Sequence, residues 1–312
     1  MAHATSFTAQ KKMTTPAWLL LLAMGALWGI SFVFSKIAVV EIEPMTLVFI
    51  RTALAALVLL AVCRISGVRL PTSFKAWRDY AVLGFFSSSL AFSLIFWAQQ
   101  FIDASLTAIL IAATPFFTVL VAGLMLADER LSTQKIIGVV IGFVGVILVV
   151  GPRHLLGLGA DLLAELAVLL AAAAYATASI WGRRFAGEQP LATATGQVTA
   201  SAVMMLPMAF IFESPLQMSM PSWPVIGAVI ALAVFCTALT YLIFFRVLKM
   251  AGASNATLVG LVIPVFTMLF AVPILGETIT LLKLSGMLMI AVGMMVLDGR
   301  PLAALRGKLK AN

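Results

Sequence analysis

Polar and aromatic side chains recur inside long apolar runs of this sequence. In one run Trp28, Ser31 and Ser35 follow each other at helical spacing, so they share one face of a helix. Side chains of these types bind a solute without reacting with it, because rings stack on apolar groups and hydroxyls meet polar ends. The candidate binding residues of this kind are Trp28, Ser31, Ser88, Thr114, Tyr175, Thr237 and Tyr241.

No residues in the sequence form a recognisable catalytic or metal-binding motif. The histidines, His3 and His154, are isolated. The cysteines, Cys63 and Cys236, lie in apolar runs without the spacing of a metal site or a disulfide framework. Hydrolase and phosphate-binding motifs are absent as well. We therefore expect a protein that is not an enzyme and that has no metal ion and no cofactor.

The composition of the chain requires lipid as its solvent. Of its 312 residues, 62% are hydrophobic and 10% are charged, whereas a soluble domain has roughly 25% charged residues. This much apolar surface cannot be hidden in a water-soluble globule, which excludes a soluble enzyme and a disordered chain. The net charge of +8 then reflects basic loops at a membrane surface, and we expect no nucleic-acid partner.

Ten apolar runs are long enough to cross a bilayer as helices, which takes about 20 residues each. They cover residues 17–39, 44–63, 79–98, 103–126, 134–151, 161–181, 191–212, 223–247, 253–275 and 280–297. The connections are too short for a domain outside the membrane. The first run is longer than the apolar segment of a cleaved signal peptide, so we expect it to be retained.

Lysine and arginine are distributed unevenly between the two sides of this predicted bundle. The side that holds the N-terminus receives 16 of the 20 basic residues and the other side receives three, while Arg51 lies inside a run. Basic residues concentrate in cytoplasmic loops. We therefore expect both termini in the cytoplasm and the chain in the inner (plasma) membrane.

The two halves of the chain resemble each other weakly. Pro115 corresponds to Pro264, and the series Glu129, Lys135, Gly138, Gly145 and Gly151 corresponds to Glu277, Lys283, Gly286, Gly293 and Gly299. Each half holds five helices, and because five is odd the second half enters the membrane from the opposite side. Such inverted repeats recur in secondary transporters, with the substrate site near the midplane. The predicted organisation is two cytoplasmic tails, 1–16 and 300–312, and two five-helix repeats, 17–152 and 153–299.

This repeat places several candidate residues at the same depth. Trp28 and Tyr175 are repeat mates, as are Phe92 and Tyr241, and each lies near the middle of its run. Serine and threonine also join helices by hydrogen bonds, which is the simpler interpretation of any single hydroxyl. For the whole set, a central cavity accounts better for the recurrence.

Pro115 and Pro264 lie near the middle of their runs. Proline removes a backbone hydrogen bond and clashes with the preceding turn, so each helix should bend there. The bend is either a static kink or one of a pair of hinges that let each half open. We retain both residues as candidate hinges.

Charged residues within the runs bear on what drives transport. Arg51 lies seven residues inside its run, about 10 Å from the end, where it could attract a substrate carboxylate, snorkel outward, or pair with Glu41 or Glu43. The acidic residues all lie within about two turns of a predicted span end. Ion-coupled carriers use a buried carboxylate, so this pattern favours uncoupled transport.

The chain resembles the ten-helix, EamA-domain members of the drug/metabolite transporter superfamily over residues 17–299. The resemblance is carried by Gly25-Ala26-Leu27-Trp28-Gly29-Ile30-Ser31-Phe32, by Arg51, by the Pro115 and Pro264 helices, and by the acidic-then-glycine segments after them. Within that group it is similar to bacterial YddG-type exporters of aromatic amino acids. The second half departs from the pattern, because Val198 stands where the first half has Arg51.

The resemblance implies export of small organic metabolites, above all amino acids including aromatic ones, by alternating access. The alternative on the same fold is a proton-coupled exporter of drugs or other metabolites. An intramembrane enzyme would need a nucleophile–base pair or metal ligands, and a channel would need a symmetric pore lining.

The expected partners are a small-molecule substrate and the lipid bilayer. A monomer suffices for this architecture, although the sequence leaves the oligomeric state open.

Overall fold

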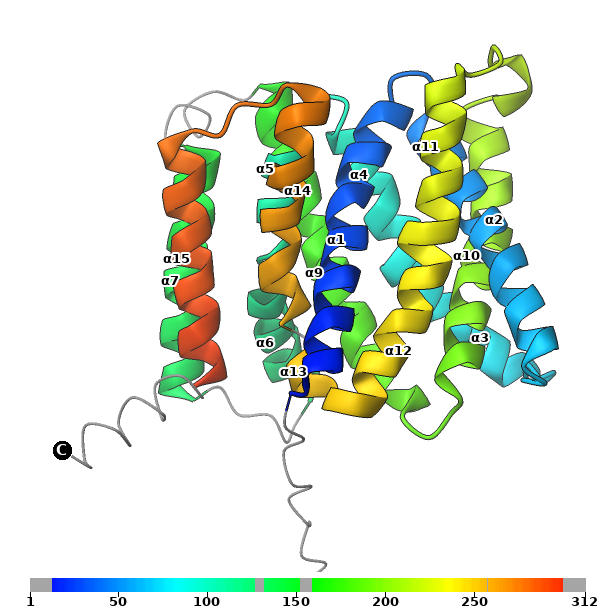
Figure 1. Ribbon diagram of the computed structural model, residues 1–312, viewed down its shortest axis with the longest axis horizontal. Coiled ribbons are helices and arrows are strands. Elements are labelled where there is room, and N and C mark those ends of the chain that lie inside the picture. Colours follow the sequence, from blue (N-terminus) through cyan, green and yellow to red (C-terminus); the bar gives the residue numbers. More distant parts are fainter. Residues whose placement is uncertain (1–12, 127–131, 152–158, 257, 300–312) are drawn as a thin grey trace, which may run out of the picture.

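The computed structural model describes residues 13–126, 132–151, 159–256 and 258–299, and these residues are helical with no strand among them (Figure 1). The helices of the first half are α1 (Thr15–Ala38), α2 (Pro44–Ile65), α3 (Phe74–Gly84), the π-helical η1 (Phe85–Leu90), α4 (Ala91–Ala98), α5 (Ala104–Ile111), α6 (Thr114–Met125) and α7 (Thr133–Val150). Together, α3, η1 and α4 form one continuous span from Phe74 to Ala98.

The second half follows the same order. Its helices are α9 (Ala160–Gly182), η2 (Arg183–Phe185), α10 (Pro190–Phe212), η3 (Pro215–Gln217), α11 (Trp223–Ala233), the π-helical η4 (Val234–Leu239), α12 (Thr240–Ala251), α13 (Ala253–Ala256), α14 (Val259–Leu275) and α15 (Leu281–Asp298). As in the first half, the third span is continuous, from Trp223 to Ala251.

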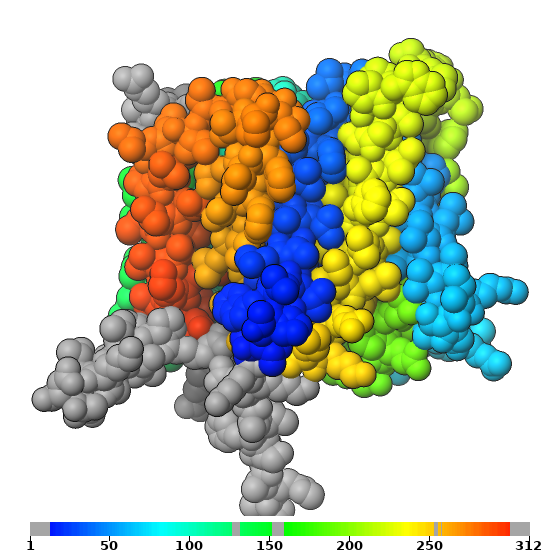
Figure 2. Space-filling model, in the orientation of Figure 1, coloured from blue at the N-terminus to red at the C-terminus, as the bar shows by residue number. Residues whose placement is uncertain are grey.

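Nine helical spans in the described residues are long and apolar enough to cross a membrane, and α14, with 17 residues, is a shorter apolar helix. The predicted all-helical, multi-span fold is therefore confirmed. The run predicted at 253–275 is divided into α13 and α14. Leucine, isoleucine and valine side chains on the outside of the bundle, such as Leu124 and Leu281, are strongly exposed, as a lipid-facing surface requires. Figure 2 shows the face of the bundle that α1, α12, α14 and α15 form.

Matching local structures recur in the two halves. The π-helical segments η1 and η4 interrupt the third span of each half. The fifth helices begin alike, because the Ser132 hydroxyl accepts a hydrogen bond from the Lys135 N–H and the Thr280 hydroxyl accepts one from the Lys283 N–H. The beginning of α1 and the end of α15 lie at the same end of the bundle (Figure 1). With five spans in each half, this arrangement makes the halves inverted.

The fifth helices of the two halves, α7 and α15, pack against each other along glycine faces. A Cβ atom on Gly293 would lie 2.7 Å from the backbone nitrogen of Gly142, and one on Gly286 would lie 2.7 Å from the carbonyl oxygen of Gly145. Only residues without a side chain allow two helix backbones to approach so closely. The pair stands at one side of the bundle (Figure 1).

The two candidate hinge prolines occupy different local structures. In the fourth span the α-helix is interrupted at Ala112 and Ala113, and Pro115 then lies in the first turn of α6. Proline is tolerated in a first turn because its missing N–H would have no partner there. Pro264 lies inside α14, which is continuous across it.

Candidate functional site

Arg51 of α2 lies at the centre of a polar and aromatic cluster that both halves build. Its side chain is only 4% exposed, and its Nε donates a hydrogen bond of 2.9 Å to the hydroxyl oxygen of Thr237 in η4. Arg51 neither snorkels outward nor pairs with Glu41, the alternatives that the sequence had left open. Its side chain turns into the bundle, and Glu41 binds Ser222 instead.

The π-helical segment η4 orients Thr237 toward Arg51. The Thr237 hydroxyl donates to the carbonyl oxygen of Leu232, five residues earlier, at 2.8 Å. Because its proton is used in that bond, its oxygen is available to accept from Arg51. A π-helical turn in a span is often found at a functional site.

Aromatic rings cover the other side of the arginine. The Arg51 guanidinium carbon lies 4.0 Å from the centroid of the Phe92 ring, close enough for a cation–π interaction. Phe92 stacks on Phe96 with 5.9 Å between centroids and meets Tyr175 of α9 edge-on at 6.4 Å. The cluster therefore joins α2 and α4 of the first half to α9 of the second.

Tyr241 and Ser88 belong to the same region. Arg51 is within electrostatic range of both Tyr175 and Tyr241, and the side chains of Ser88 and Gln197 lie close to the Tyr241 hydroxyl. Phe92, Tyr175 and Tyr241 are partly buried residues. Four of the predicted site residues, Ser88, Tyr175, Thr237 and Tyr241, are thus brought together.

The other three predicted residues make different contacts, and their place in the site stays a prediction. Trp28 packs in a cluster with Leu21, Met24 and Phe244, with 6.2 Å between the Trp28 and Phe244 ring centroids. The Ser31 hydroxyl donates to the Trp28 carbonyl of its own helix, and the Thr114 hydroxyl donates to the Ile111 carbonyl at the end of α5, both at 2.6 Å. A hydroxyl bonded to the preceding helical turn still has lone pairs that can accept.

Two residues of the cluster, Phe92 and Gln197, are not among the predicted site residues. Phe92 had a signal, because it is the repeat mate of Tyr241. Gln197 is buried and lies on α10 where Gly84 approaches that helix closely. Its place near Tyr241 depends on the packing of α10 and therefore had no signal in the sequence alone.

At the end of the bundle opposite the chain termini, two carboxylates bind the beginnings of helices in the other half. Glu213 accepts from the backbone N–H groups of Met45 and Thr46 at 2.8 and 2.6 Å. Glu277 accepts from those of Ala104 and Ser105 at 2.7 and 3.0 Å. A carboxylate at a helix N-terminus satisfies free N–H groups and is favoured by the helix dipole.

Further polar contacts lie at the same end of the bundle as Glu213 and Glu277. Lys283 pairs with Asp103, and Lys36 donates to the backbone oxygens of Gln99 and Ile102. The Ser222 hydroxyl and backbone N–H donate to Glu41 at 2.7 and 2.6 Å and lower the pKa of that carboxyl. The halves are thus joined by hydrogen bonds and an ion pair at this end.

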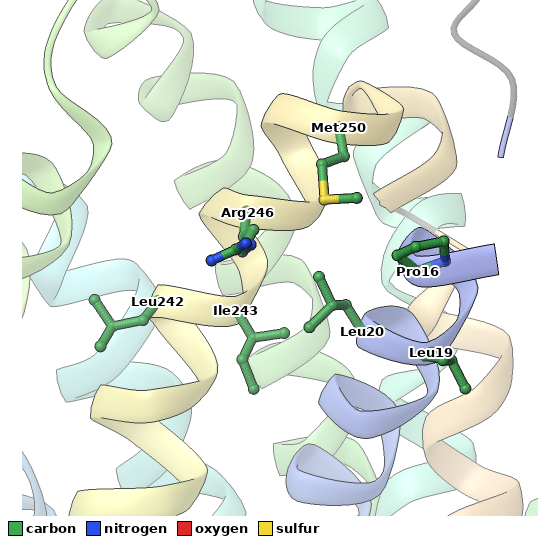
Figure 3. Close-up of a pocket in the computed structure, with 7 residues that line it drawn as sticks. All are labelled: Pro16, Leu19, Leu20, Leu242, Ile243, Arg246 and Met250. Atoms are coloured by element: carbon green, nitrogen blue, oxygen red, sulfur yellow. The ribbon is translucent and has the colours of Figure 1, made fainter. Parts of the chain in front are cut away.

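Pockets in the described residues lie at the two ends of the bundle. One pocket, of about 550 Å³, lies between α1 and α12 near the beginning of α1 and is lined by Pro16, Leu19, Leu20, Leu242, Ile243, Arg246 and Met250 (Figure 3). A second pocket, of about 310 Å³, is bordered by Lys36, Val39, Val40, Gln99 and Gln100. Neither is lined by the predicted site residues, so the predicted central cavity stays a prediction.

Known proteins similar to this chain are membrane transporters. The chain is 24% identical to the uncharacterized transporter YoaV of Bacillus subtilis, covering 88% of this chain and 93% of that one. It is also 24% identical to a protein of Salmonella typhimurium named "Probable amino-acid metabolite efflux pump", covering 89% and 93%. YedA of Escherichia coli, described as an uncharacterized inner membrane transporter, is 22% identical over 83% of each chain.

The fold and the family both have independent support. A solved crystal structure with 20% sequence identity matches with a TM-score of 0.65, covering 91% of this chain and 98% of that one, which shows a shared fold. The family model described as "EamA-like transporter family" matches twice, at residues 15–151 and 162–297. These two matches cover nearly all of the ten spans. The chain is therefore a multi-pass membrane protein that belongs to the EamA-like transporter family.

Proposed function

We propose that this transporter exports small organic metabolites, most readily amino acids including aromatic ones, by uncoupled alternating access across the inner membrane. The observation that carries the proposal is the cluster around Arg51, where Thr237, Tyr175 and Tyr241 of the second half meet Ser88 and Phe92 of the first. A charged group, hydroxyls and aromatic rings are the complements of an amino acid's charged ends and an apolar side chain.

The name of one relative supports this substrate class. The Salmonella typhimurium protein is named for the efflux of amino-acid metabolites. At 24% identity the relation supports a proposal about this chain and leaves its substrates to experiment. We extend the same proposal to the orientation, with both termini in the cytoplasm, because of the 16-to-3 distribution of basic residues.

Alternating access is supported by the difference between the two ends of the bundle. At the end opposite the termini, hydrogen bonds from Glu213 and Glu277 and the Lys283–Asp103 ion pair tie the halves together. At the other end, a pocket of about 550 Å³ is lined by residues of α1 from the first half and α12 from the second, and among the described residues no hydrogen bond or ion pair joins these two helices there (Figure 3). In this proposal the structure is an inward-facing state, and Pro115 and Pro264 are hinges for the change to outward-facing.

Proton coupling is the second candidate, and one observation favours it. Glu165 in α9 is 1% exposed, so a carboxylate near the end of its span is nevertheless buried. Such a group is where a coupling proton would bind. We retain uncoupled export as the first proposal because the Arg51 cluster has no described carboxylate among its members.

The test is transport by the purified chain in liposomes. Vesicles are loaded with radiolabelled phenylalanine, tryptophan, threonine or lysine, and release is followed with and without a pH gradient. Uncoupled export is supported if release is faster than from vesicles without protein and is equal with and without the pH gradient. Transport that requires the gradient and is lost in Glu165→Gln supports the proton-coupled alternative. No release of any amino acid contradicts the proposal.

A further inference from the structure

Arg51 carries a buried charge that no described carboxylate balances. Its side chain is 4% exposed. The described groups that interact with it electrostatically are Tyr175, Tyr241 and Cys236, and none of them is a carboxylate. An unpaired buried ion is among the least favourable arrangements in a protein, and more so within a bilayer. A negatively charged partner from outside the chain would remove that cost.

The Arg51 guanidinium has N–H groups that can donate hydrogen bonds to such a partner. Its Nε is bonded to Thr237, and its face lies over the Phe92 ring. Among the described residues, the bond from Nε to Thr237 is the hydrogen bond that this side chain makes, so its two terminal nitrogens have no hydrogen-bond partner there. The four N–H groups on those nitrogens include a planar pair whose spacing matches the two oxygens of a carboxylate.

The surroundings hold the guanidinium in one orientation. Thr237 is fixed by its own bond to the Leu232 carbonyl oxygen, so Arg51 is bound to an acceptor that cannot turn away. Phe92 is in turn stacked on Phe96. A group held in this way loses little conformational entropy when a ligand binds, which raises affinity.

A buried arginine at this position is present in the first half of the chain only. Val198, which stands in the second half where Arg51 stands in the first, is fully buried in an apolar cluster with Ala55 and Leu59. The cluster therefore offers one anchoring cation beside the rings of Phe92, Tyr175 and Tyr241.

We infer that Arg51 binds the carboxylate of the transported solute and thereby selects organic monocarboxylates, with an aromatic or apolar remainder against Phe92 and Tyr175. This inference rests on the proposed function and deepens it by naming the substrate class and the residue that recognises it. Thr237 is a positioning residue, because it acts through Arg51.

The first experiment measures binding and does not depend on export. The purified chain in detergent is heated with phenylalanine, phenylpropionate or phenethylamine, three compounds that share a ring and differ in their charged groups. We expect phenylalanine and phenylpropionate to raise Tm and phenethylamine, which lacks the carboxylate, to bind at least about tenfold more weakly. Equal stabilisation by phenethylamine overturns the inference.

The second experiment tests Arg51 with matched variants. Arg51→Met keeps an unbranched apolar stem and removes the guanidinium charge, and Arg64→Met makes the same change at an exposed position of the same helix. We expect Arg51→Met to lose the preference for carboxylates by about tenfold or more, and Arg64→Met to keep it. A preserved preference in Arg51→Met overturns the inference.

If the size-exclusion profile shows that Arg51→Met does not fold, Thr237→Val replaces it in the binding experiment. It keeps the positive charge but removes the acceptor that orients it. We expect a partial loss of the same preference, whereas an unchanged preference overturns the inference. If no amino acid is exported but phenylpropionate binds through Arg51, the proposed export of amino acids fails and this inference stands. If amino acids are exported without any dependence on Arg51, the proposed export of amino acids stands and this inference fails.

Discussion

The ammonium nitrogen of Lys283 lies 2.5 Å from a carboxylate oxygen of Asp103, which joins α15 of the second half to the beginning of α5 in the first. The Asp103 side chain is 45% exposed and that of Lys283 13%, and an ion pair that water still reaches on one side contributes modestly, about 1 kcal/mol. Its position is more informative than its strength, because it stands with Glu277 at the end where the halves are tied together. Breaking it should favour the state in which that end opens.

Asp103→Asn should therefore increase access from the outside to the pocket that Val39 borders. A single cysteine at Val39, in a chain whose buried Cys63 and Cys236 are replaced by alanine, is labelled with a membrane-impermeant maleimide. We expect labelling to be several-fold faster in Asp103→Asn. Arg78→Met is the control, since it breaks an exposed pair with Asp79 at the other end. Equal rates in the two variants would show that the pair does not hold this end closed.

The α7–α15 contact predicts a large difference between two glycine substitutions. A Cβ on Gly293 would lie 2.7 Å from a backbone atom of α7, whereas one on Gly227 of α11 meets nothing within 4 Å. Gly293→Ala should lose about 1–3 kcal/mol through overpacking, and Gly227→Ala should be neutral or slightly stabilising because alanine favours helix. Thermal denaturation in detergent measures both, and equal Tm values would contradict the close contact.

Tyr241 belongs to the Arg51 cluster and Trp28 is the aromatic residue that the sequence predicts for the same cavity, so both rings are expected to matter most for large substrates. Trp28→Ala and Tyr241→Ala are each expected to lower the initial export rate of phenylalanine roughly tenfold, taking about 1.4 kcal/mol for the lost ring contact. Threonine export should fall less. Rates are compared at equal membrane expression. If both variants transport like the parent chain, these rings only pack and the cavity lies elsewhere.

Glu41 gives a pH dependence whose sign follows from its hydrogen bonds. The Ser222 hydroxyl and backbone N–H lower the pKa of Glu41 in the folded chain below its unfolded value. The stabilisation is therefore fully present above the unfolded pKa and is lost as the pH falls through the lowered one. We expect the Tm difference between the parent and Glu41→Gln to be largest near neutral pH and to shrink in acid. Glu43→Gln is the control, because Glu43 makes no such bond at the beginning of α2. A Tm difference that stays constant with pH would argue against the lowered pKa.

The predicted orientation is tested by reporter fusions. A phosphatase that is active only outside the cytoplasm and a fluorescent protein that is active only inside it are fused to either end. With 16 basic residues on the side of the termini against three on the other, we expect fluorescence and no phosphatase activity at both ends. Phosphatase activity at either end would refute the topology.

The sequence by itself determined the ten spans, their order and the duplication of the five-helix unit. Apolar runs of about 20 residues cannot fold otherwise in lipid, because each backbone group must find its partner within its own helix. It also indicated the chemical types at the site, since a polar residue in an apolar run is detectable one residue at a time.

Tertiary packing alone decided which of these residues meet. Ser88, Tyr175, Thr237 and Tyr241 come together around Arg51, whereas Trp28 packs against Phe244, although all of them lie on spans of similar apolar character. That difference depends on the rotation of each helix about its axis and on the π-helical turn that presents Thr237. Both arise from contacts between residues nearly 190 positions apart, such as Arg51 with Thr237, and no local pattern in the sequence records them.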